Sequence, residues 1–534
     1  MWTLIVLGVI VAVAAIVTVH DLWQTKHAIL KNFPIIGHFR YWLEAIGPEL
    51  RQYIVTSNNE ERPFSRDQRT WVYASSKREN NYFGFGTDDD LESSPNHLII
   101  KHAAFPIHDP HPGEKEFDQE FRIPCAKVMG AYRGRRFAFR PKSVVNVSGM
   151  SFGSLSGPAV EALNIGSKLA GCLHNTGEGG ISPYHQRGGD LIMQVGTGYF
   201  GCRDSHGNFD LGMFKEVVAA NPVRAVEIKL SQGAKPGVGG FLPSAKITAE
   251  ISRIRGIPQG RDCASPSNHT AFRNVDEMLD FIEKLADASG VPIGIKSAVG
   301  ELHFWTDLAE SMARTHRGVD FITIDGGEGG TGAAPLVFAD HVALPFKIGF
   351  GRVYREFVKF DLHHHVVFNG SGKLGFPETG LFAMALGCDI ISVAREAMLA
   401  IGCIQAQRCH TGHCPSGVAT QNWWLKRGLD PTLKSFRVAN YVATLRKELL
   451  RLSRACGVVH PSLVTLDHFD VLDDRLQALA ATTLFDHRPE WGLPSADDQE
   501  TIRRIMSAPL DQRDSLVRLE VMGTKRPTLA ESSV

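Results

Sequence analysis

Eight short apolar runs, each followed by a helix-compatible stretch, dominate the chain between Pro141 and Ala400. Strands that alternate with helices imply βα units and a parallel sheet. Eight units favour a closed (β/α)8 TIM barrel, and a doubly wound open sheet is the alternative. The runs are Ser143–Val147, Gly171–His174, Leu191–Val195, Ala225–Leu230, Pro292–Ile295, Phe321–Ile324, Val366–Phe368 and Ile390–Val393.

Polar and glycine-rich residues come directly after nearly every run, and this placement favours the barrel. The C-terminal ends of barrel strands meet at one rim, where the loops form the active site. We therefore expect the residues at these run ends to converge there. They are Met150, Ser151, Asn175–Glu178, Gln194, Lys229, Lys296, Asp325, Gly326, Gly327, Asn369–Gly372, Ala394 and Arg395.

Two of these loops suggest a phosphate site. Gly370 and Gly372 follow the seventh run, and Ala394 and Arg395 follow the eighth, where barrels commonly bind phosphate through backbone N–H groups. A short glycine stretch alone is often only a turn. Lys296, at the end of the fifth run, could place positive charge beside a flavin ring and stabilise the reduced flavin. A surface lysine at a strand end is the alternative interpretation. From these two loops we therefore expect FMN, and not a dinucleotide, as the cofactor.

A second chemical signal is the run of three cysteines at 403, 409 and 414, with five and four residues between them. Closely grouped thiolates suit an iron–sulfur cluster, and three of them indicate three irons. A zinc site with His410 or His413 as a fourth ligand is the rival interpretation, although structural zinc usually shows paired C-x2-C spacing. A disulfide or chance clustering is the least specific alternative.

Two lysines, Lys229 at the end of the fourth run and Lys235, flank a glycine-rich loop together with Gln232. Lys246 and Arg255 lie downstream. Fixed cations of this kind suit a small dicarboxylate, whose two ends need positive partners. A solvated loop is the alternative for Lys235. It is less favoured for Lys229, which ends an apolar run.

The first residues of the chain form an uncharged, apolar stretch from Trp2 to Val19, about 27 Å long as a helix. A cleaved signal peptide is the alternative, but no Lys or Arg precedes the stretch. Basic residues follow it, at Lys26, Lys31 and Arg40, and predict a single-pass anchor with the catalytic part in the cytoplasm.

Composition limits the function classes. The 534 residues carry a formal net charge of zero, so the chain has no basic footprint for nucleic acid. Six of the nine cysteines are scattered singly, unlike a disulfide framework.

We expect a transmembrane anchor at 1–24, an extension at 25–140, the barrel with its iron–sulfur segment at 141–422 and a helical region at 423–534. The last region includes an amphipathic helix, 441–454, expected to pack on the barrel.

Several segments together resemble the FMN-binding synthase domain of the glutamate synthase family, in order from Ser143 to Gln421. The resemblance implies a barrel with FMN, a [3Fe–4S] cluster on Cys403, Cys409 and Cys414, and reduction of 2-iminoglutarate to glutamate. By position, Glu178, Lys229, Lys235 and Arg255 match the family's residues around 2-oxoglutarate. The segments are Met150–Ser156, Asn175–Gly180, Gln232–Gly237, Asp325–Gly332 and Cys403–Thr420.

The chain also departs from the family pattern. Val238 and Phe241 stand where the family has Glu and Gln, and Asn274 replaces, by count, a serine near the oxo acid. Loss of a polar partner shifts specificity strongly, so a different small acid is an open alternative. A second open alternative is that the chain is an electron-transfer module between a soluble carrier and a membrane partner.

The partners follow from the same resemblance. The chain opens with an apolar stretch and not with a cysteine nucleophile, so we expect a stand-alone form without a glutaminase domain. Ammonia or another subunit would then supply nitrogen. We expect ferredoxin or a separate reductase subunit as the electron donor.

Overall fold

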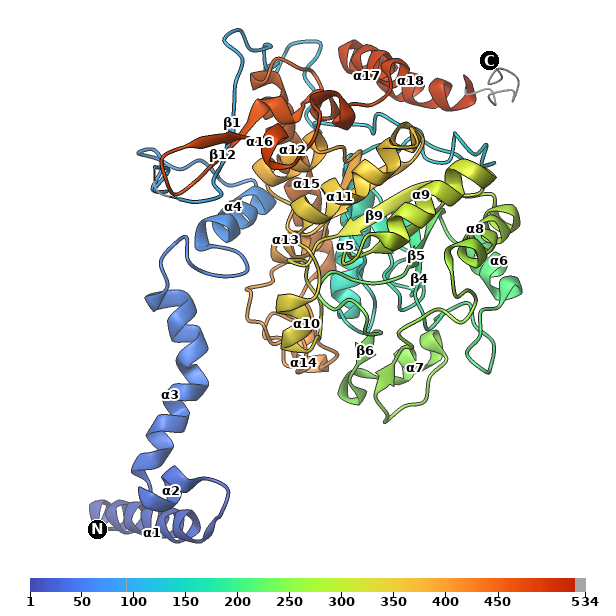
Figure 1. The fold of residues 1–534 in the computed structure, drawn as a ribbon. Coiled ribbons are helices and arrows are strands. Elements are labelled where there is room, and N and C mark those ends of the chain that lie inside the picture. Colours follow the sequence, from blue (N-terminus) through green and yellow to red (C-terminus); the bar gives the residue numbers. More distant parts are fainter. Residues whose placement is uncertain (93, 524–534) are drawn as a thin grey trace. The chain divides into compact units, whose positions relative to one another are not determined.

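Eight parallel strands close into a barrel in the computed structural model, which describes residues 1–92 and 94–523 (Figure 1). The hydrogen-bonded order is β10-β11-β2-β3-β4-β5-β8-β9, so the strands are neighbours in chain order and the last pairs with the first. Every predicted run overlaps a strand, and the predicted (β/α)8 fold is confirmed. The strands are β2 Val145–Val147, β3 His174–Asn175, β4 Leu191–Val195, β5 Val223–Lys229, β8 Ile293–Ser297, β9 Phe321–Asp325, β10 Val367–Ser371 and β11 Ile390–Val393.

Helices follow the strands, with one departure from the predicted alternation. The segment 176–190, between β3 and β4, has no helix. It contains five glycines and a proline, and both residue types disfavour helix. The helices after the other strands are α5 Gly157–Ala170, α6 Leu211–Ala220, α7 Ala249–Arg255, α8 Val275–Ser289, α9 His303–Thr315, α10 Leu336–His341, α11 Phe346–Val358, α12 Pro377–Ala385 and α13 Arg395–Ala400.

The two ends of the barrel differ in what covers them. Figure 1 shows α7, α10 and β6 (Phe241–Leu242) at one end, where the strands terminate, and β6 pairs antiparallel with β7 (Cys263–Ala264). At the other end, an apolar cluster joins the segment before β2 to the strand starts. It comprises Cys125, Met129, Phe139, Leu173, Ile192, Ala225, Phe321, Val367 and Ile390. The segment 125–139 therefore closes the N-terminal end of the barrel.

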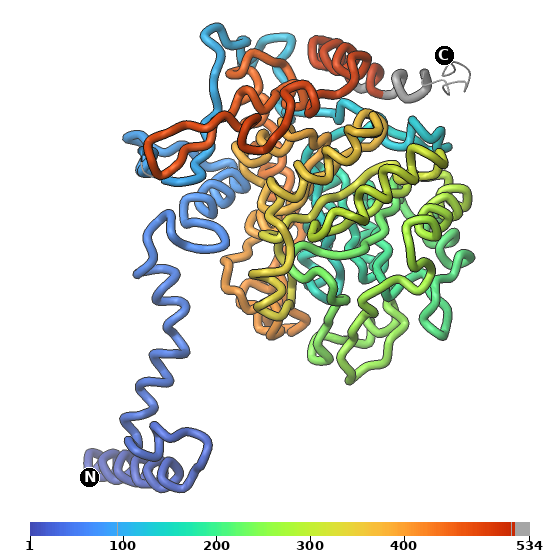
Figure 2. The backbone as a smooth tube through the Cα atoms, in the orientation of Figure 1, coloured from blue at the N-terminus to red at the C-terminus, as the bar shows by residue number. Residues whose placement is uncertain are grey.

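The C-terminal region packs on the barrel helices. Helix α15 (Pro431–Ala455) lies against α5, and a Cβ on Gly166 would come within 2.5 Å of Val438, so glycine permits this close approach. The predicted packing of the 441–454 helix is confirmed. Strand β12 (Phe469–Leu472) pairs antiparallel with β1 (Leu98–Ile100), so residues distant in sequence lie side by side (Figure 2).

The remaining elements of this region complete it. They are β13 Ala478–Ala480, α14 Trp423–Lys426, α16 Ala481–Leu484, α17 Ala496–Ser507 and α18 Leu510–Gly523. Residues 524–534 of the predicted C-terminal region lie outside the described residues. The division at 24, 140 and 422 stays a prediction.

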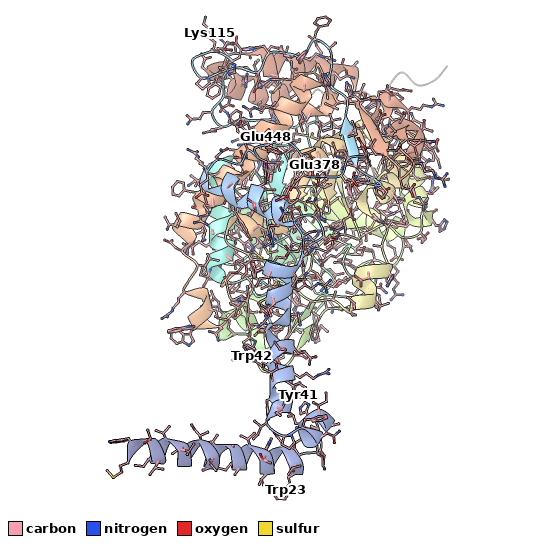
Figure 3. All side chains as sticks on the ribbon, turned by 90° about the vertical axis from the view of Figure 1, so that its left-hand side faces the viewer. Trp23, Tyr41, Trp42, Lys115, Glu378 and Glu448 are labelled. Atoms are coloured by element: carbon pink, nitrogen blue, oxygen red, sulfur yellow. The ribbon has the colours of Figure 1, made fainter. Side chains whose placement is uncertain are left out.

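Residues Met1–Arg69 form a unit separate from Thr70–Val534. Its helices are α1 Trp2–Trp23, α2 Ala28–Asn32 and α3 Ile36–Leu50; α4, Arg66–Lys77, begins at its end. The carboxylate of Asp21 ties α1 to α3, because it accepts hydrogen bonds from the Ile35 amide and from His38 Nε2, both at 3.0 Å. Trp23 ends α1, and Trp42 lies exposed on α3 (Figure 3).

Candidate active site

A pocket opens at the rim formed by the C-terminal ends of the strands. Six cationic side chains and one carboxylate line it, so it is strongly electropositive. Residues that follow β2, β3, β5 and β11 meet there with others from β4 and β8. The charged lining residues are Glu178, Lys229, Lys235, Lys246, Arg255, Lys296 and Arg395.

The single carboxylate of the pocket, Glu178, is paired with Lys229. Lys229 Nζ donates to Glu178 Oε1 at 2.9 Å and to Gln232 Oε1 at 3.1 Å. Burial alone would raise the pKa of Glu178, but Lys229, Lys235 and Arg255 lower it below its ordinary value. A Cβ on Gly196 or Gly240 would come within 2.6 Å of this carboxylate, so these glycines leave the space it occupies. Glu178 is therefore an ionised hydrogen-bond acceptor.

Lys235 presents a poorly compensated positive charge. Its Nζ donates to the Ala333 carbonyl at 3.1 Å, and the residue is 7% exposed. Burial, together with the nearby Lys229, lowers the pKa of Lys235 to about 8, although Glu178 opposes the shift. A bound anion would relieve this cost, so the surroundings of Lys235 suit a carboxylate ligand.

Arg255 contributes a second buried cation. It is the last residue of α7, which Gly256 ends in the left-handed conformation at φ +62°. Its Nη2 donates to the Phe152 carbonyl at 3.0 Å, whereas its Nε is buried without a partner among the described residues. Burial lowers the pKa of Arg255. An orphaned donor beside a pocket is a ready partner for an anionic ligand.

A layer of polar side chains fills the barrel interior around Glu227, which sequence reasoning missed. Glu227 Oε1 accepts hydrogen bonds from Asn175 Nδ2 at 2.8 Å and Gln194 Nε2 at 2.6 Å. Its Oε2 accepts from Thr323 Oγ1 at 2.6 Å. The available signal was an acid within the apolar run 225–230, because a charge there must find partners. Glu227 holds Gln194, which lines the pocket.

Lys296, at the end of β8, lies in the pocket wall with Asp325 behind it. Their Nζ and Oδ2 atoms are 3.4 Å apart, and Asp325 Oδ2 also accepts from the Gly233 amide at 2.9 Å. Burial would lower the pKa of Lys296, but Asp325 and Glu227 raise it above its ordinary value. Lys296 therefore stays protonated.

The predicted cofactor residues divide into two groups. Met150, Ser151, Gln194, Lys296, Ala394 and Arg395 line the pocket. The others support the rim from behind: the amides of Gly326 and Gly327 donate to the carbonyls of Ser371 and Leu344. Gly370 lies within β10, and a Cβ on Gly372 would lie 3.3 Å from Gly326. The segment Gly330–Ala333 lines the pocket in addition to the predicted residues.

The cysteine segment reaches the same pocket through Cys409 and His410. Lys246 Nζ donates to the Cys409 carbonyl at 2.9 Å and to the Ser154 carbonyl at 3.0 Å. Burial raises the pKa of Cys409, the neighbouring Cys414 adds to this, and Lys246 opposes it. No three donor atoms of this segment's cysteines and histidines lie within 4.8 Å of one another among the residues described.

The three residues that depart from the family pattern lie at different places relative to the pocket. Phe241 lines the pocket, next to Gly240. Val238 is partly exposed and does not line it. Asn274 is exposed and caps α8 by accepting a hydrogen bond from the Glu277 amide, so its expected place near the oxo acid is wrong. Ser265, and not Asn274, lines the pocket. The long segment between β5 and α8 contains β6, α7 and β7, so counting residues along the family pattern does not locate the matching position.

The fold and the pocket define a (β/α)8-barrel protein with an electropositive site at the C-terminal ends of its strands. Residues 132–459 match the conserved region in glutamate synthase, and the chain belongs to the glutamate synthase family. The glutamate synthase large subunit-like protein YerD of Bacillus subtilis is 38% identical over 493 residues, 87% of this chain and 93% of YerD.

Other similarities cover a smaller part of this chain. An archaeal glutamate synthase [NADPH] of Methanocaldococcus jannaschii is 34% identical over 318 residues, which cover 59% of each protein. Among solved structures, a mutant of an active chimera of (S)-mandelate dehydrogenase has a TM-score of 0.42 and 14% identity, covering 75% of this chain and 97% of that one. This structural similarity is too loose to bear on function.

Proposed function

We propose that the chain is an FMN- and iron–sulfur-dependent oxidoreductase that reduces the imino acid formed from 2-oxoglutarate and ammonia to glutamate. The observation that carries the proposal is the pocket with six cations and one carboxylate, in a chain of the glutamate synthase family. Such a charge balance favours a dicarboxylate and a phosphate-bearing cofactor.

The pocket residues fit a flavin mononucleotide. Arg395 lines the pocket at the start of α13, beside the glycines at 330 and 332, and suits a phosphate. A Cβ on Gly149 would lie 3.3 and 3.4 Å from the side chains of Asn175 and Gln194, so the pocket wall is tightly packed there. Lys296 supplies positive charge at the wall. When bound, reduced FMN would supply a hydride to the imino carbon of the substrate.

The three cysteines fit a [3Fe–4S] cluster better than zinc. Structural zinc usually shows paired C-x2-C spacing, which the segment 403–414 lacks. Three closely grouped thiolates suit a cluster, in which each thiolate bonds a separate iron. Lys246 adds positive charge beside Cys409. When bound, the cluster would deliver electrons one at a time to the adjoining pocket.

The chain's own residues would bind and orient the substrate. Lys235 and Arg255 hold the carboxylates, because both are buried cations that donate to backbone carbonyls and form no ion pair within residues 1–92 and 94–523. Lys229 holds Glu178 in its ionised form. That carboxylate accepts a hydrogen bond from the protonated imine nitrogen and so stabilises the electrophile.

A different small acid is the second candidate, and Phe241 favours it. An aromatic ring at this position of the pocket replaces a polar partner of the family pattern. Stopped-flow reoxidation of the reduced flavin, with ammonia and a panel of oxo acids, separates the candidates. Fastest reoxidation by 2-oxoglutarate supports glutamate formation. Fastest reoxidation by an oxo acid with an apolar end supports the second candidate, and none by any acid contradicts both.

The electron donor is proposed as ferredoxin or a separate reductase subunit. The name of the Methanocaldococcus relative specifies NADPH, but the match covers 59% of that protein. The G-x-G-x-x-G pattern occurs at Gly327–Gly332 after β9 and at Gly370–Gly375 at the end of β10, but both strands belong to the closed barrel and not to an open dinucleotide-binding sheet. A reduction assay with ferredoxin and with NADPH, each followed by flavin bleaching, distinguishes the donors.

Helix α1 is proposed as a retained membrane anchor. Its 22 residues span about 33 Å, and it passes the length and composition test for a membrane-spanning helix, which a signal sequence also passes. Trp2 and Trp23 flank it, as aromatic residues flank membrane spans. Basic residues after it favour a cytoplasmic catalytic part. An N-terminal sequence of the mature protein separates an anchor from a cleaved signal.

A further inference from the structure

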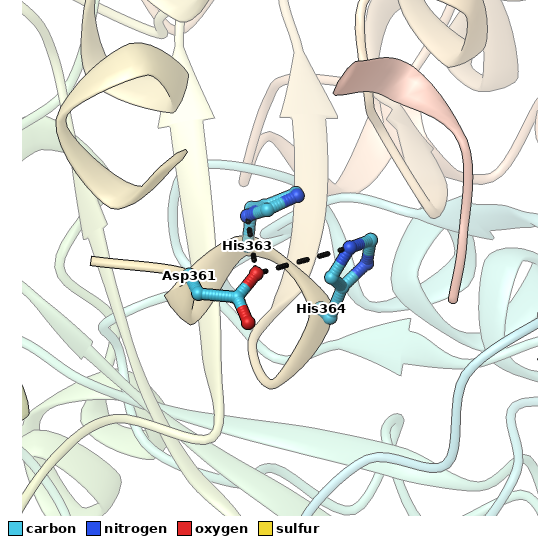
Figure 4. Close-up of side chains that lie close together, drawn as sticks. All are labelled: Asp361, His363 and His364. Carbon is cyan, nitrogen blue, oxygen red and sulfur yellow. Dashed lines mark ion pairs between the residues drawn. The ribbon is translucent and has the colours of Figure 1, made fainter. Parts of the chain in front are cut away.

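The turn between α11 and β10 brings an aspartate and two histidines together, away from the pocket. Asp361 begins it in the left-handed conformation at φ +54°, and the 3-10 turn Leu362–His364 follows. Because the turn precedes β10, it lies at the N-terminal end of the barrel, opposite the rim. Figure 4 shows His363 and His364 both beside the Asp361 carboxylate.

The three side chains present donor atoms to a common point. His363 Nδ1 lies 3.7 Å and His364 Nε2 lies 4.0 Å from Asp361 Oδ1, and one atom from each residue falls within 4.8 Å of the others. In a tetrahedral zinc site with bonds of about 2.0–2.1 Å, the ligand atoms are about 3.3 Å apart. Small side-chain rotations would therefore bring these atoms into coordination distance.

A buried nitrogen without a partner points into this cluster. His363 is 7% exposed, and its Nδ1, which faces Asp361, has no hydrogen-bond partner among the described residues. A buried unsatisfied polar atom costs about 1–3 kcal/mol. A metal ion would satisfy this nitrogen, and the hydrogen bonds inside the turn do not.

The chemical types of the three side chains suit a cation. Asp361 gives the cluster a negative charge, and imidazoles with a carboxylate are a common zinc ligand set. The nearest lysine, Lys127, is already neutralised by Asp389 at 3.0 Å. Lys127 also donates to the carbonyls of His363 and Val366, at 2.6 and 3.1 Å, and so fixes the backbone of the turn.

We propose that Asp361, His363 and His364 bind one divalent transition-metal ion of the zinc type, with water in the remaining position. Two imidazoles and one carboxylate select zinc-like ions over calcium or magnesium, which prefer oxygen ligands alone. The site joins the end of α11 to β10 and lies opposite the pocket, so its role is to stabilise the barrel. This inference does not rest on the proposed function.

Zinc titration of the cluster-loaded, FMN-loaded protein tests the proposal by calorimetry. We expect one zinc ion per chain and a higher Tm when it binds. Asp361→Asn and His364→Gln should each weaken binding at least about tenfold. Asn accepts the left-handed backbone that Asp361 adopts, and Asp361 is exposed, so this variant should fold.

Two controls locate the ion. His365→Gln changes the neighbouring histidine, which stacks on Tyr132 with ring centroids 3.8 Å apart, and should leave zinc affinity unchanged. Cys409→Ser should also leave it unchanged, with iron measured in parallel. Absence of binding, equal binding in Asp361→Asn and the parent, or loss of binding in Cys409→Ser would each overturn the proposal.

Discussion

Replacing Lys235 with methionine tests whether this buried cation binds the substrate or stabilises the fold. Lys235 is 7% exposed, and its pKa of about 8 lies below the ordinary 10.5. At about 1.36 kcal/mol for each pKa unit, the charge costs the ligand-free protein about 3 kcal/mol. Lys235→Met should therefore leave the free energy of unfolding at neutral pH unchanged or raise it by up to that amount.

The same change should reduce catalysis. Loss of a buried cation that holds a substrate carboxylate removes about 2–4 kcal/mol of transition-state binding, a 30- to 1000-fold fall in kcat/KM. Oxo-acid-dependent flavin reoxidation measures the loss, and chemical denaturation measures stability. FMN content should stay normal, since Lys235 is not among the residues proposed to hold the flavin.

Lys127→Met is the matched control. Lys127 is also buried, but an ion pair to Asp389 and two backbone carbonyls surround it. Breaking one partner of such a pair costs about 3–5 kcal/mol of stability. If Lys235→Met instead loses stability as this control does, or keeps full kcat/KM, the substrate role of Lys235 is refuted.

The remaining predictions concern other features. With the pKa of free Lys235 at about 8, kcat/KM for the oxo acid should fall as pH rises through 8, and Lys235→Arg should abolish this limb. Glu227→Gln should destabilise the protein by about 1–3 kcal/mol in denaturant titrations, because one charge-assisted hydrogen bond is lost. Cys409→Ser should remove about three irons per chain while acid-released FMN stays constant; stoichiometric zinc in the parent would contradict the cluster. Protease added to spheroplasts should leave the barrel intact, and digestion would reverse the proposed topology.

The barrel was predictable because its strands are short apolar runs, nearly all followed directly by polar or glycine-rich residues. Leu191–Val195 and Ile390–Val393 match β4 and β11 at both ends. The order of strands follows from chain order in this fold. The helix-free segment 176–190 was not predicted, although its glycines and proline are visible in the sequence.

The site was predictable only in part. Lys229 ends β5 and Glu178 follows β3, and the rim brings Lys229 Nζ to 2.9 Å from Glu178 Oε1. The position of Asn274 was not predictable by counting residues along the family pattern, because the segment between β5 and β8 contains the paired strands β6 and β7 and the helix α7. The partners of Glu227 come from three other strands, and pairing of this kind appears only in three dimensions.

The most direct test of the proposed activity is transfer of labelled nitrogen. Holoprotein reduced by ferredoxin is mixed with 2-oxoglutarate and 15N-ammonium, and the amino acid is analysed by mass spectrometry. We expect one 15N-glutamate for every two electrons consumed. Consumption of electrons without any 15N-labelled glutamate would contradict the proposed glutamate synthesis.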